Sequence, residues 1–477
     1  MAAVAVPSIM GAYGVPQNQA QWATTAYIAA NVASQLLNAW ATRTLGRRFA
    51  YCLAITVFCI GGVAATVAPG IELLIVGRIV QGMAAGVLQG ASLVTIVEAF
   101  PPERRRFAIS LFGMGQMLAI GIAPFIGGVV IDTFSWRAVF LAPMLPVVAA
   151  FVISLATMPG RQPDQARLEF DWTGFVLVVT SLACIMATVG NGQRWGWDSW
   201  EILTVAIVGV VAVTLLIASQ LHAETPLIDV GLFRNPRFAG AITLSFLFGL
   251  STFSINYLIP VFVQEVQGMT PTAAGLILLP GGLLLAVATP IVGRMAEVVS
   301  PRVLLVIAFT FCGTSSAVLA AADVNTPSAV LLVVSTFTLV SFGVIQPALG
   351  GNMVASVPAE RMNAGVGLYN FARQFGGSLG IATTVLIIDL RTAFHADALT
   401  ATQTSGNPMV AEMLAKVRRL LHESGLPDAV LHSGALDYLG KVVHAQASTF
   451  GFQDAFLCIS IAFAVSVVAS WLLGRAH

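Results

Sequence analysis

The chain has 477 residues, of which 57% are hydrophobic and only 9% are charged. A soluble protein usually carries about 25% charged residues, so this composition excludes an ordinary soluble fold and indicates an all-α integral membrane protein. The formal net charge of +1 and the absence of a basic block give no sign of a nucleic-acid partner.

Apolar runs long enough to cross a bilayer, about 17–25 residues, recur along the whole chain. Residues 1–14 form a further apolar piece that is too short to span. With that piece counted as the stump of a first helix, we expect about fourteen spans, of which about thirteen are intact. The intact spans are expected near residues 22–41, 49–69, 72–98, 107–131, 136–158, 172–190, 200–220, 237–264, 272–296, 302–322, 328–350, 363–390 and 452–473.

Residues 78–86 (RIVQGMAAG) place an arginine and a glutamine inside an apolar run. Arg78 and Gln81 are three residues apart and therefore share one helix face. A cation inside a bilayer costs several kcal/mol unless it faces a bundle interior, a partner or water. The alternative is an arginine that extends to the headgroups, but the small residues that follow favour close helix packing. We therefore predict a polar site inside a helix bundle.

Two connections divide the chain. The polar segment 159–171 precedes two spans joined by a tryptophan-rich turn at residues 191–197 (NGQRWGW), which is typical of an interfacial aromatic belt. We therefore expect an N-terminal bundle over residues 1–160, a linker with two extra spans over residues 161–235, and a C-terminal bundle over residues 236–477.

The C-terminal bundle is expected to contain one long outer loop, residues 391–451. Within it, Asn407-Pro408 can begin a helix, and an apolar stripe ends before Gly425. The stripe consists of Val410, Met413, Leu414, Val417 and Leu421. A helix lying on the membrane or on the outer mouth of the bundle explains it better than a ligand site does.

The loops on one side of the predicted bundle hold about fourteen arginines, and the short loops on the other side hold about two. The arginine-rich side should be cytoplasmic, and the C-terminus should lie on that side. The protein is therefore expected to be a multi-pass protein of the inner or plasma membrane.

The inner loop 39–48 (AWATRTLGRR) is echoed by residues 293–302 (GRMAEVVSPR). Repeated halves are typical of transporters, with the substrate site near the midplane between them. Further motifs follow in order, namely 121–128 (GIAPFIGG), 170–174 (FDWTG), 192–197 (GQRWGW), 274–280 (AGLILLP) and 370–380 (NFARQFGGSLG).

With these motifs, nearly the whole chain resembles the major facilitator superfamily, and more narrowly its fourteen-span drug:proton antiporters of the EmrB/QacA type. The resemblance implies two six-helix halves with two extra central spans. It implicates Arg78 in proton coupling, together with Gln81 and Arg373 as a polar site of the bundle. Arg373 has the same alternative as Arg78, extension to the headgroups, which is the less favoured reading. The resemblance also implies a conformational motif formed by Gly121, Pro124, Gly127, Gly128, Gly46, Arg47, Gly293 and Glu297.

Three departures from the family pattern stand out. Arg43 occupies the place of an aspartate and Ala39 that of a glycine in the first inner loop. Residues 5–7 (AVP) resemble the end of the first-span motif, whose aspartate would fall just before Met1. We therefore expect the first span to be truncated in this sequence.

The candidate substrate-cavity residues are Phe112, Met114, Gln116, Asn256, Tyr257, Gln346, Tyr369 and Asn370. The five cysteines lie in apolar runs without a paired CxxC, so no metal site or disulfide framework is expected. No nucleophile–base pair or phosphate loop suggests an enzyme, and the proton gradient takes the place of a cofactor.

The predicted function is proton-coupled export of small hydrophobic or amphipathic compounds by alternating access. The alternatives are a dedicated exporter of one metabolite, siderophore or antibiotic, and a transporter-like sensor or scaffold without coupling. The expected partners are the small-molecule substrate and the lipid bilayer, and a periplasmic adaptor protein is a further candidate partner.

Overall fold

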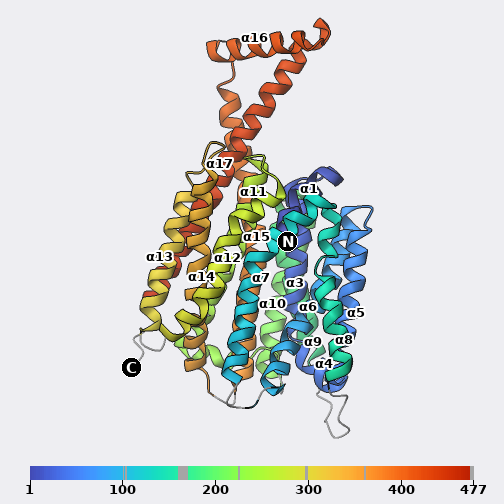
Figure 1. Ribbon diagram of the computed structural model, residues 1–477, viewed down its shortest axis with the longest axis vertical. Coiled ribbons are helices and arrows are strands. Elements are labelled where there is room, and N and C mark those ends of the chain that lie inside the picture. Colours follow the sequence, from blue (N-terminus) through green and yellow to red (C-terminus); the bar gives the residue numbers. More distant parts are fainter. Residues whose placement is uncertain are drawn as a thin grey trace.

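A computed structural model of the chain describes residues 1–99, 101, 105–158, 170–223, 226–295, 299–358, 361–404 and 406–472. Every regular element in these ranges is a helix, and the helices form an elongated bundle with one long projection (Figure 1). The all-α prediction is confirmed. We call the end with the projection the hairpin end and the opposite end the loop end.

The first part of the bundle contains the helices that place Arg78. They are α1 (Ala2–Tyr13), α2 (Gln17–Ala20), α3 (Trp22–Gln35), α4 (Asn38–Thr44), α5 (Arg47–Thr66), α6 (Ile71–Ala99), α7 (Arg105–Thr133), η2 (Trp136–Phe140) and α8 (Met144–Thr157). The span expected at residues 22–41 is therefore divided, because the helix is interrupted at Leu36 and Leu37 before α4 begins.

Two helices follow in the centre of the chain, α9 (Trp172–Trp195) and α10 (Trp200–His222). Asp171 joins them at the loop end. One of its carboxylate oxygens accepts the N–H of Gly174 at 2.7 Å, and the other accepts the side-chain amide of Gln220 at 2.7 Å. One carboxylate thus caps α9 and binds the end of α10.

The remaining helices form the second part of the bundle. They are η3 (Val230–Arg234), α11 (Pro236–Glu265), α12 (Pro271–Met295), α13 (Pro301–Leu319), α14 (Ser328–Ser356), α15 (Met362–Ala401), α16 (Pro408–Glu423) and α17 (Asp428–Leu472). Several begin with proline in the first turn, where its missing N–H is not needed. Asn235 and Asn407 cap α11 and α16 with their side-chain oxygens.

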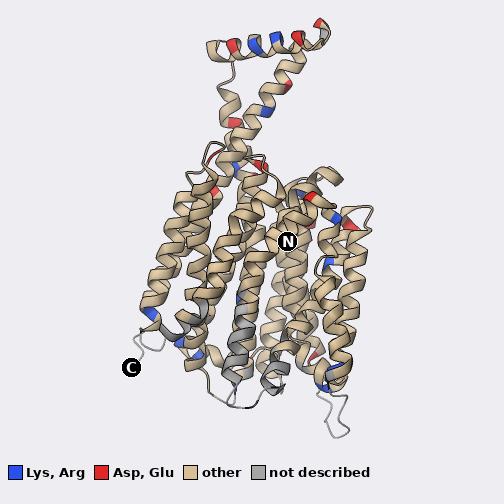
Figure 2. Cartoon of the chain, viewed as in Figure 1, with Lys and Arg blue, Asp and Glu red and all other residues tan. Residues whose placement is uncertain are grey.

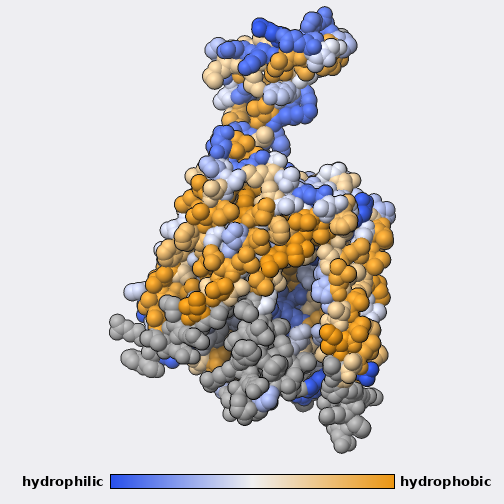
Figure 3. Space-filling model, viewed as in Figure 1, coloured by the Kyte–Doolittle hydropathy of each residue, from blue (hydrophilic) through white to orange (hydrophobic). Residues whose placement is uncertain are grey.

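Eleven helices of the described part are long and apolar enough to cross a membrane. The helix Ala2–Tyr13 and the apolar stretch Leu118–Thr133 of α7 are shorter. Hydrophobic side chains cover the outer surface of the bundle (Figure 3), while charged residues gather at its ends and on the projection (Figure 2). This distribution is the one that a bilayer requires.

The projection corrects the expectation of a loop at residues 391–451. α15 is 40 residues long and α17 is 45 residues long, so each extends about 60 Å or more, roughly twice the hydrocarbon thickness of a bilayer. Both therefore continue beyond the membrane as a helical hairpin, residues 391–451, with α16 across its tip (Figure 1). At its base, Asp454 accepts hydrogen bonds from Arg391 at 2.5 Å and from His395 at 2.8 Å.

The two parts of the bundle meet mainly where α7 packs against α12, α3 against α15, and α1 against α11. The α7–α12 contact is the most extensive. A Cβ on Gly121 would overlap the Cα of Gly282, and a Cβ on Gly282 would overlap that of Gly121. A Cβ on Gly275 would lie 2.7 Å from the carbonyl oxygen of Pro124. Only glycine permits this approach of the two backbones.

We predict that Gly121→Val destabilises the protein, because overpacking in a close contact typically costs about 1–3 kcal/mol. The measurement is the midpoint of thermal unfolding of the purified protein, which should fall by several degrees. Gly115→Val on the same helix is the matched control, because a Cβ there meets nothing within 4 Å. Equal midpoints for the two variants would contradict the close α7–α12 contact.

Candidate functional site

Arg78 lies in the interior of the first part of the bundle, and only 8% of its surface is exposed. Its Nε donates to the carbonyl oxygen of Ala23 at 2.7 Å, and its Nη1 donates to Oε1 of Gln81 at 2.7 Å. The guanidinium carbon lies 4.1 Å from the ring centroid of Tyr27 and 5.5 Å from that of Phe140. The side chain thus does not extend to the headgroups.

The partners of Arg78 come from three elements that small residues hold together. A Cβ on Gly82 of α6 would overlap the carbonyl oxygen of Tyr27 on α3. A Cβ on Gly61 of α5 would lie 2.7 Å from the backbone nitrogen of Gln81. The amide nitrogen of Gln81, which is fully buried, points to the carbonyl oxygen of Phe140 at 3.5 Å. The glycines therefore set the distance at which carbonyls and rings reach the guanidinium.

All described contacts of Arg78 are made by neutral groups. The described part of the chain shows no carboxylate among them. A buried cation is stabilised here by one backbone carbonyl, one amide and the electron-rich face of an aromatic ring. The arrangement can hold a positive charge in place and leaves that charge available to act on a group that enters from outside the cluster.

Arg373 lies on α15 in the second part of the bundle. Its Nη2 is 3.5 Å from Oδ1 of Asn370, and its Nε has no hydrogen-bond partner within the described residues. A Cβ on Gly249 would overlap the carbonyl oxygen of Arg373, so α11 and α15 are in backbone contact at this point. Gln81 and Arg78 form one cluster, and within the described residues no hydrogen bond or ion pair joins Arg373 to it.

A chain of amides connects the two parts of the bundle. Nε2 of Gln374 on α15 donates to Oε1 of Gln89 on α6 at 3.2 Å, and the same oxygen accepts from Nε2 of Gln35 on α3 at 3.2 Å. Closer to the hairpin end, the hydroxyl of Ser378 donates to the carbonyl oxygen of Thr25 at 3.3 Å. Only neutral groups form these bridges, so they can break without leaving a buried charge unpaired.

Gln35, Gln89, Gln374 and Ser378 were not among the predicted site residues, although the motif at residues 370–380 includes Gln374 and Ser378. The sequence spacing could have pointed to Gln374, because it follows the predicted site residue Asn370 by four residues and therefore shares its helix face. The contact across the two parts could not be deduced without the packing of α3 against α15.

The predicted conformational motif divides between two places. Gly121, Pro124 and Gly128 lie in the α7–α12 contact, where a Cβ on Gly128 would overlap the carbonyl oxygen of Pro271. A Cβ on Gly127 would lie 3.0 Å from Cα of Met1. Gly46 begins α5 at the loop end with a positive φ of 83°, which permits the turn before Arg47. Gly293 lies in α12, and Glu297 lies outside the described residues.

The predicted cavity residues are not all in one environment. Tyr257 is only 1% exposed and packs in the core, with its hydroxyl 3.4 Å from Nε2 of Gln17. Tyr369 is also buried, whereas Gln116, Asn256, Gln346 and Asn370 are half-buried. The side chains of Phe112 and Met114 are outside the described residues. Asn256 and Asn370 each donate to a carbonyl of their own helix.

Figure 3 shows a hollow between the two parts of the bundle in its loop-end half, with hydrophilic residues at its depth. The hairpin-end half is closed there by the α7–α12 contact, including the hydrogen bond from the N–H of Thr272 to Oδ2 of Asp132 at 2.9 Å. Among the described residues, the two parts are therefore in close contact in the hairpin-end half and separated by the hollow in the loop-end half.

We predict that Tyr27→Leu lowers the thermal unfolding midpoint, because it removes a cation–π contact to a buried guanidinium that is worth about 1–2 kcal/mol. Tyr27→Phe is the matched control, because it keeps the ring and should leave the midpoint within about one degree of the wild type. If Tyr27→Phe lowered the unfolding midpoint as much as Tyr27→Leu, the hydroxyl of Tyr27, and not its ring, would be the group that supports Arg78.

Comparison with known proteins agrees with this geometry. The Major Facilitator Superfamily model matches residues 1–381. The multidrug export protein EmrB of Escherichia coli (strain K12) is 28% identical over 427 residues, covering 88% of this chain and 82% of that protein. The methylenomycin A resistance protein of Streptomyces coelicolor is 26% identical, covering 81% of each chain.

Among solved structures, a POT family transporter in complex with 5-aminolevulinic acid superposes with a TM-score of 0.65 at 13% identity, covering 99% of this chain and 91% of that chain. This similarity establishes the fold alone. The family match extends over most of the chain, and the protein belongs to the major facilitator superfamily, in which its curated relatives include multidrug exporters of the EmrB type.

Proposed function

We propose that this protein is a proton-coupled exporter of small hydrophobic or amphipathic compounds that works by alternating access. The observation that carries the proposal is the buried Arg78 held by neutral partners. A cation in this position costs several kcal/mol, so a chain that keeps one needs its charge. The relatives named as multidrug export and antibiotic resistance proteins support the export direction.

In this proposal, Arg78 does not carry the transported proton, because a guanidinium stays protonated in proteins. Its fixed charge favours the ionised form of an acid that comes close to it and so tunes when that acid releases a proton. Tyr27 and Gln81 hold the guanidinium in one place while that acid approaches and leaves. The coupling step is therefore a change in the distance between an acid and a fixed cation.

Alternating access requires that the contacts which close one end can open. The α7–α12 contact at the hairpin end is a backbone contact between glycines, and the bridges of Gln89, Gln374 and Ser378 are neutral hydrogen bonds. Neither kind of contact holds a buried charge, and the carboxylate of Asp132, which accepts the N–H of Thr272 across the seam, is already exposed. We propose that the hairpin-end half of this seam opens while the loop-end hollow closes.

The expected test is export by energised cells that express the protein. Arg78→Ala should abolish proton-driven export of a hydrophobic cationic dye, while the protein remains inserted in the membrane. Arg78→Lys should restore export only in part, because an ammonium lacks the planar fork that binds Ala23 and Gln81 at the same time. Dye efflux and membrane content of the protein are measured together.

Arg361→Ala provides the matched control, because Arg361 forms an exposed ion pair with Asp229 at 3.3 Å, and such pairs contribute about 0–1 kcal/mol. It should export at the wild-type rate. An Arg78→Ala variant with wild-type efflux would refute the proposed role. A wild-type protein that exports no compound, although it is folded, would favour a sensor or scaffold instead.

We also propose that the loop end faces the cytoplasm, because arginines of the described part are concentrated there, including Arg43, Arg48 and Arg237. The hairpin would then face the periplasm or the outside. It exposes apolar side chains, with Met409 77% and Leu420 56% exposed. We propose a periplasmic adaptor protein as the partner that covers them.

Sidedness can be tested with single cysteines in a variant without native cysteines. Ser424→Cys on the hairpin should react with a membrane-impermeant thiol reagent in intact cells, whereas Ser300→Cys at the loop end should react only after permeabilisation. Both positions lie outside the membrane and Ser300 is exposed. The reverse pattern would invert the orientation, and it would leave the role of Arg78 to the export experiment.

A further inference from the structure

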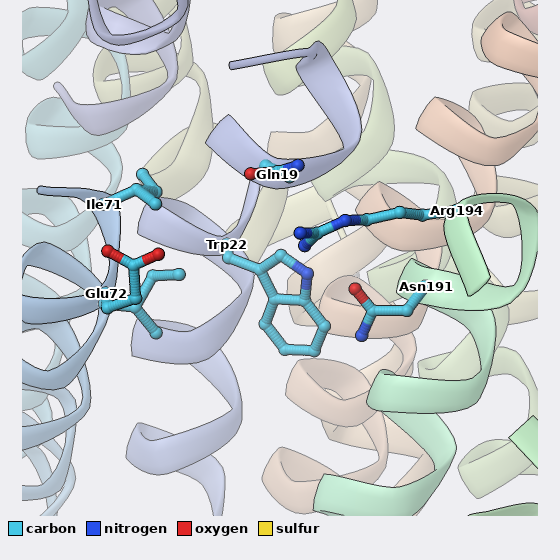
Figure 4. A pocket seen from close by; sticks show the side chains of 7 residues that line it. Gln19, Trp22, Ile71, Glu72, Asn191 and Arg194 are labelled. Carbon is cyan, nitrogen blue, oxygen red and sulfur yellow. The ribbon is translucent and has the colours of Figure 1, made fainter. Parts of the chain in front are cut away.

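A small pocket lies at the hairpin end of the bundle, apart from Arg78 and the loop-end hollow. Its volume is about 200 Å³, and it is lined by Gln19, Trp22, Ile71, Glu72, Ile75, Asn191 and Arg194. Helices α3, α6 and α9 contribute to it, together with α2. Figure 4 shows the guanidinium of Arg194 close to the Trp22 indole and the carboxylate of Glu72 farther off on the neighbouring helix.

The two charges of this pocket have no ion pair in the described part of the chain, with each other or with another residue. Each stands at a helix end where its sign suits the dipole, Glu72 in the first turn of α6 and Arg194 in the last turn of α9. The helix dipole explains why each of the two residues, taken alone, stands at its helix end. It does not explain why opposite charges and an aromatic ring line one pocket.

The size of the pocket limits what can bind. A volume of 200 Å³ equals about seven waters at liquid density, and it is below the range of about 300–1,000 Å³ for sites that enclose drug-sized ligands. The ligand should therefore place only a small group here, with one positive and one negative charge. An exported compound of ordinary size would not be enclosed.

The position of the pocket identifies the source of such a group. Trp195, Trp197 and Trp200 follow Arg194 and are 41%, 44% and 82% exposed, as expected at the headgroup level of a membrane. On the neighbouring α6, Leu73 and Val76 are 41% and 52% exposed and present an apolar surface toward the lipid. A ligand with a charged head in the pocket could lay its hydrocarbon chains along that surface.

We propose that this pocket binds the headgroup of a phosphatidylethanolamine from the adjacent leaflet. Arg194 forms paired hydrogen bonds with the phosphate, and Glu72 accepts the N–H groups of the ammonium. Asn191 donates its own amide N–H to the carbonyl of Ala187 at 3.2 Å, so its oxygen remains to accept from the ammonium. The Trp22 ring adds a cation–π contact with the same group.

The position of Trp22 itself depends on α9. A Cβ on Gly190 would lie 2.8 Å from Cζ2 of the indole, so the glycine provides the space for the ring. The pocket therefore exists because an extra central span packs against α3. The bound lipid would bridge α6 of the first part of the bundle and the extra span, and this binding is independent of the export that we propose.

The test is lipid binding to the purified full-length protein, measured by native mass spectrometry during titration. Dioleoyl phosphatidylethanolamine should bind at least about tenfold more tightly than dioleoyl phosphatidylglycerol, which has no amine, and a tenfold difference is about 1.4 kcal/mol. Free phosphoethanolamine carries the same charges without the chains, and it should bind far more weakly than the lipid.

Glu72→Gln and Arg194→Gln should each lose at least about tenfold of this affinity. Glu201→Gln is the matched control, because Glu201 is exposed in the first turn of α10 and lies outside the pocket, so it should keep the wild-type affinity. The exchange of both charges, Glu72→Arg with Arg194→Glu, should restore part of the affinity lost in the single variants.

Three outcomes would overturn the proposal. Equal binding of phosphatidylglycerol would indicate a simple anion site. Equal binding of free phosphoethanolamine would indicate a soluble zwitterion and not a lipid. Wild-type affinity in both Gln variants, with unchanged unfolding midpoints, would place the bound lipid elsewhere on the bundle.

Discussion

The guanidinium of Arg78 is the group around which the first part of the bundle is arranged. A buried cation requires partners at defined distances, and here these partners belong to α3, α6 and η2. The glycines of α5 and α6 are needed because the carbonyls and rings could not reach the guanidinium across bulkier side chains. The cost of burying the charge therefore determines how closely three elements pack, and any change in that packing alters the environment of the charge.

The contact between the two parts of the bundle, in contrast, is not arranged around a buried charge. Gly121 and Gly282 meet backbone to backbone, and the hydrogen bonds across the seam come from amides and hydroxyls and, at its hairpin end, from the N–H of Thr272 to the carboxylate of Asp132. A contact of this kind is stabilised by dispersion and by neutral hydrogen bonds, each of which is modest in net strength. A firmly held charge within one part, with neutral side-chain bridges between the parts, forms a combination that can move as two bodies without disturbing the polar site.

The sequence predicted the class of fold well because hydrocarbon imposes it. Runs of apolar residues must become helices when no water can satisfy the backbone, and the burial of Arg78 follows from the same cost. The two errors also have physical reasons. The interruption at Leu36 and Leu37 leaves no signal in hydropathy, since both residues are apolar. Residues 391–451 were expected as an outer loop that contains one helix, and α16 is that helix, but α15 and α17 also continue as helices into water.

The contacts that involve distant residues were beyond sequence reasoning for a different reason. The bridge between Gln89 and Gln374 joins residues 285 positions apart, and one amide among apolar residues gives no indication of its partner. Tyr257 is a second example. It was expected to line the substrate cavity, whereas the packing of its helix places it in the core. Hydropathy indicates how deep a residue lies, and only helix packing determines which way it faces.

The extra central helix α9 packs against both parts of the bundle. α9 contacts α3 of the first part and α15 of the second, and these two helices form one of the seams between the parts. Ser378 of α15 lies 3.1 Å from the sulfur of Met186, and Gly190 admits the ring of Trp22 from α3. A helix that contacts both sides of a seam resists separation of the two sides unless it remains attached to one and slides on the other. The small side of α9 at Gly190 faces α3, so the movement that opens this seam must either carry α9 with α3 or withdraw Trp22 from its place beside the glycine.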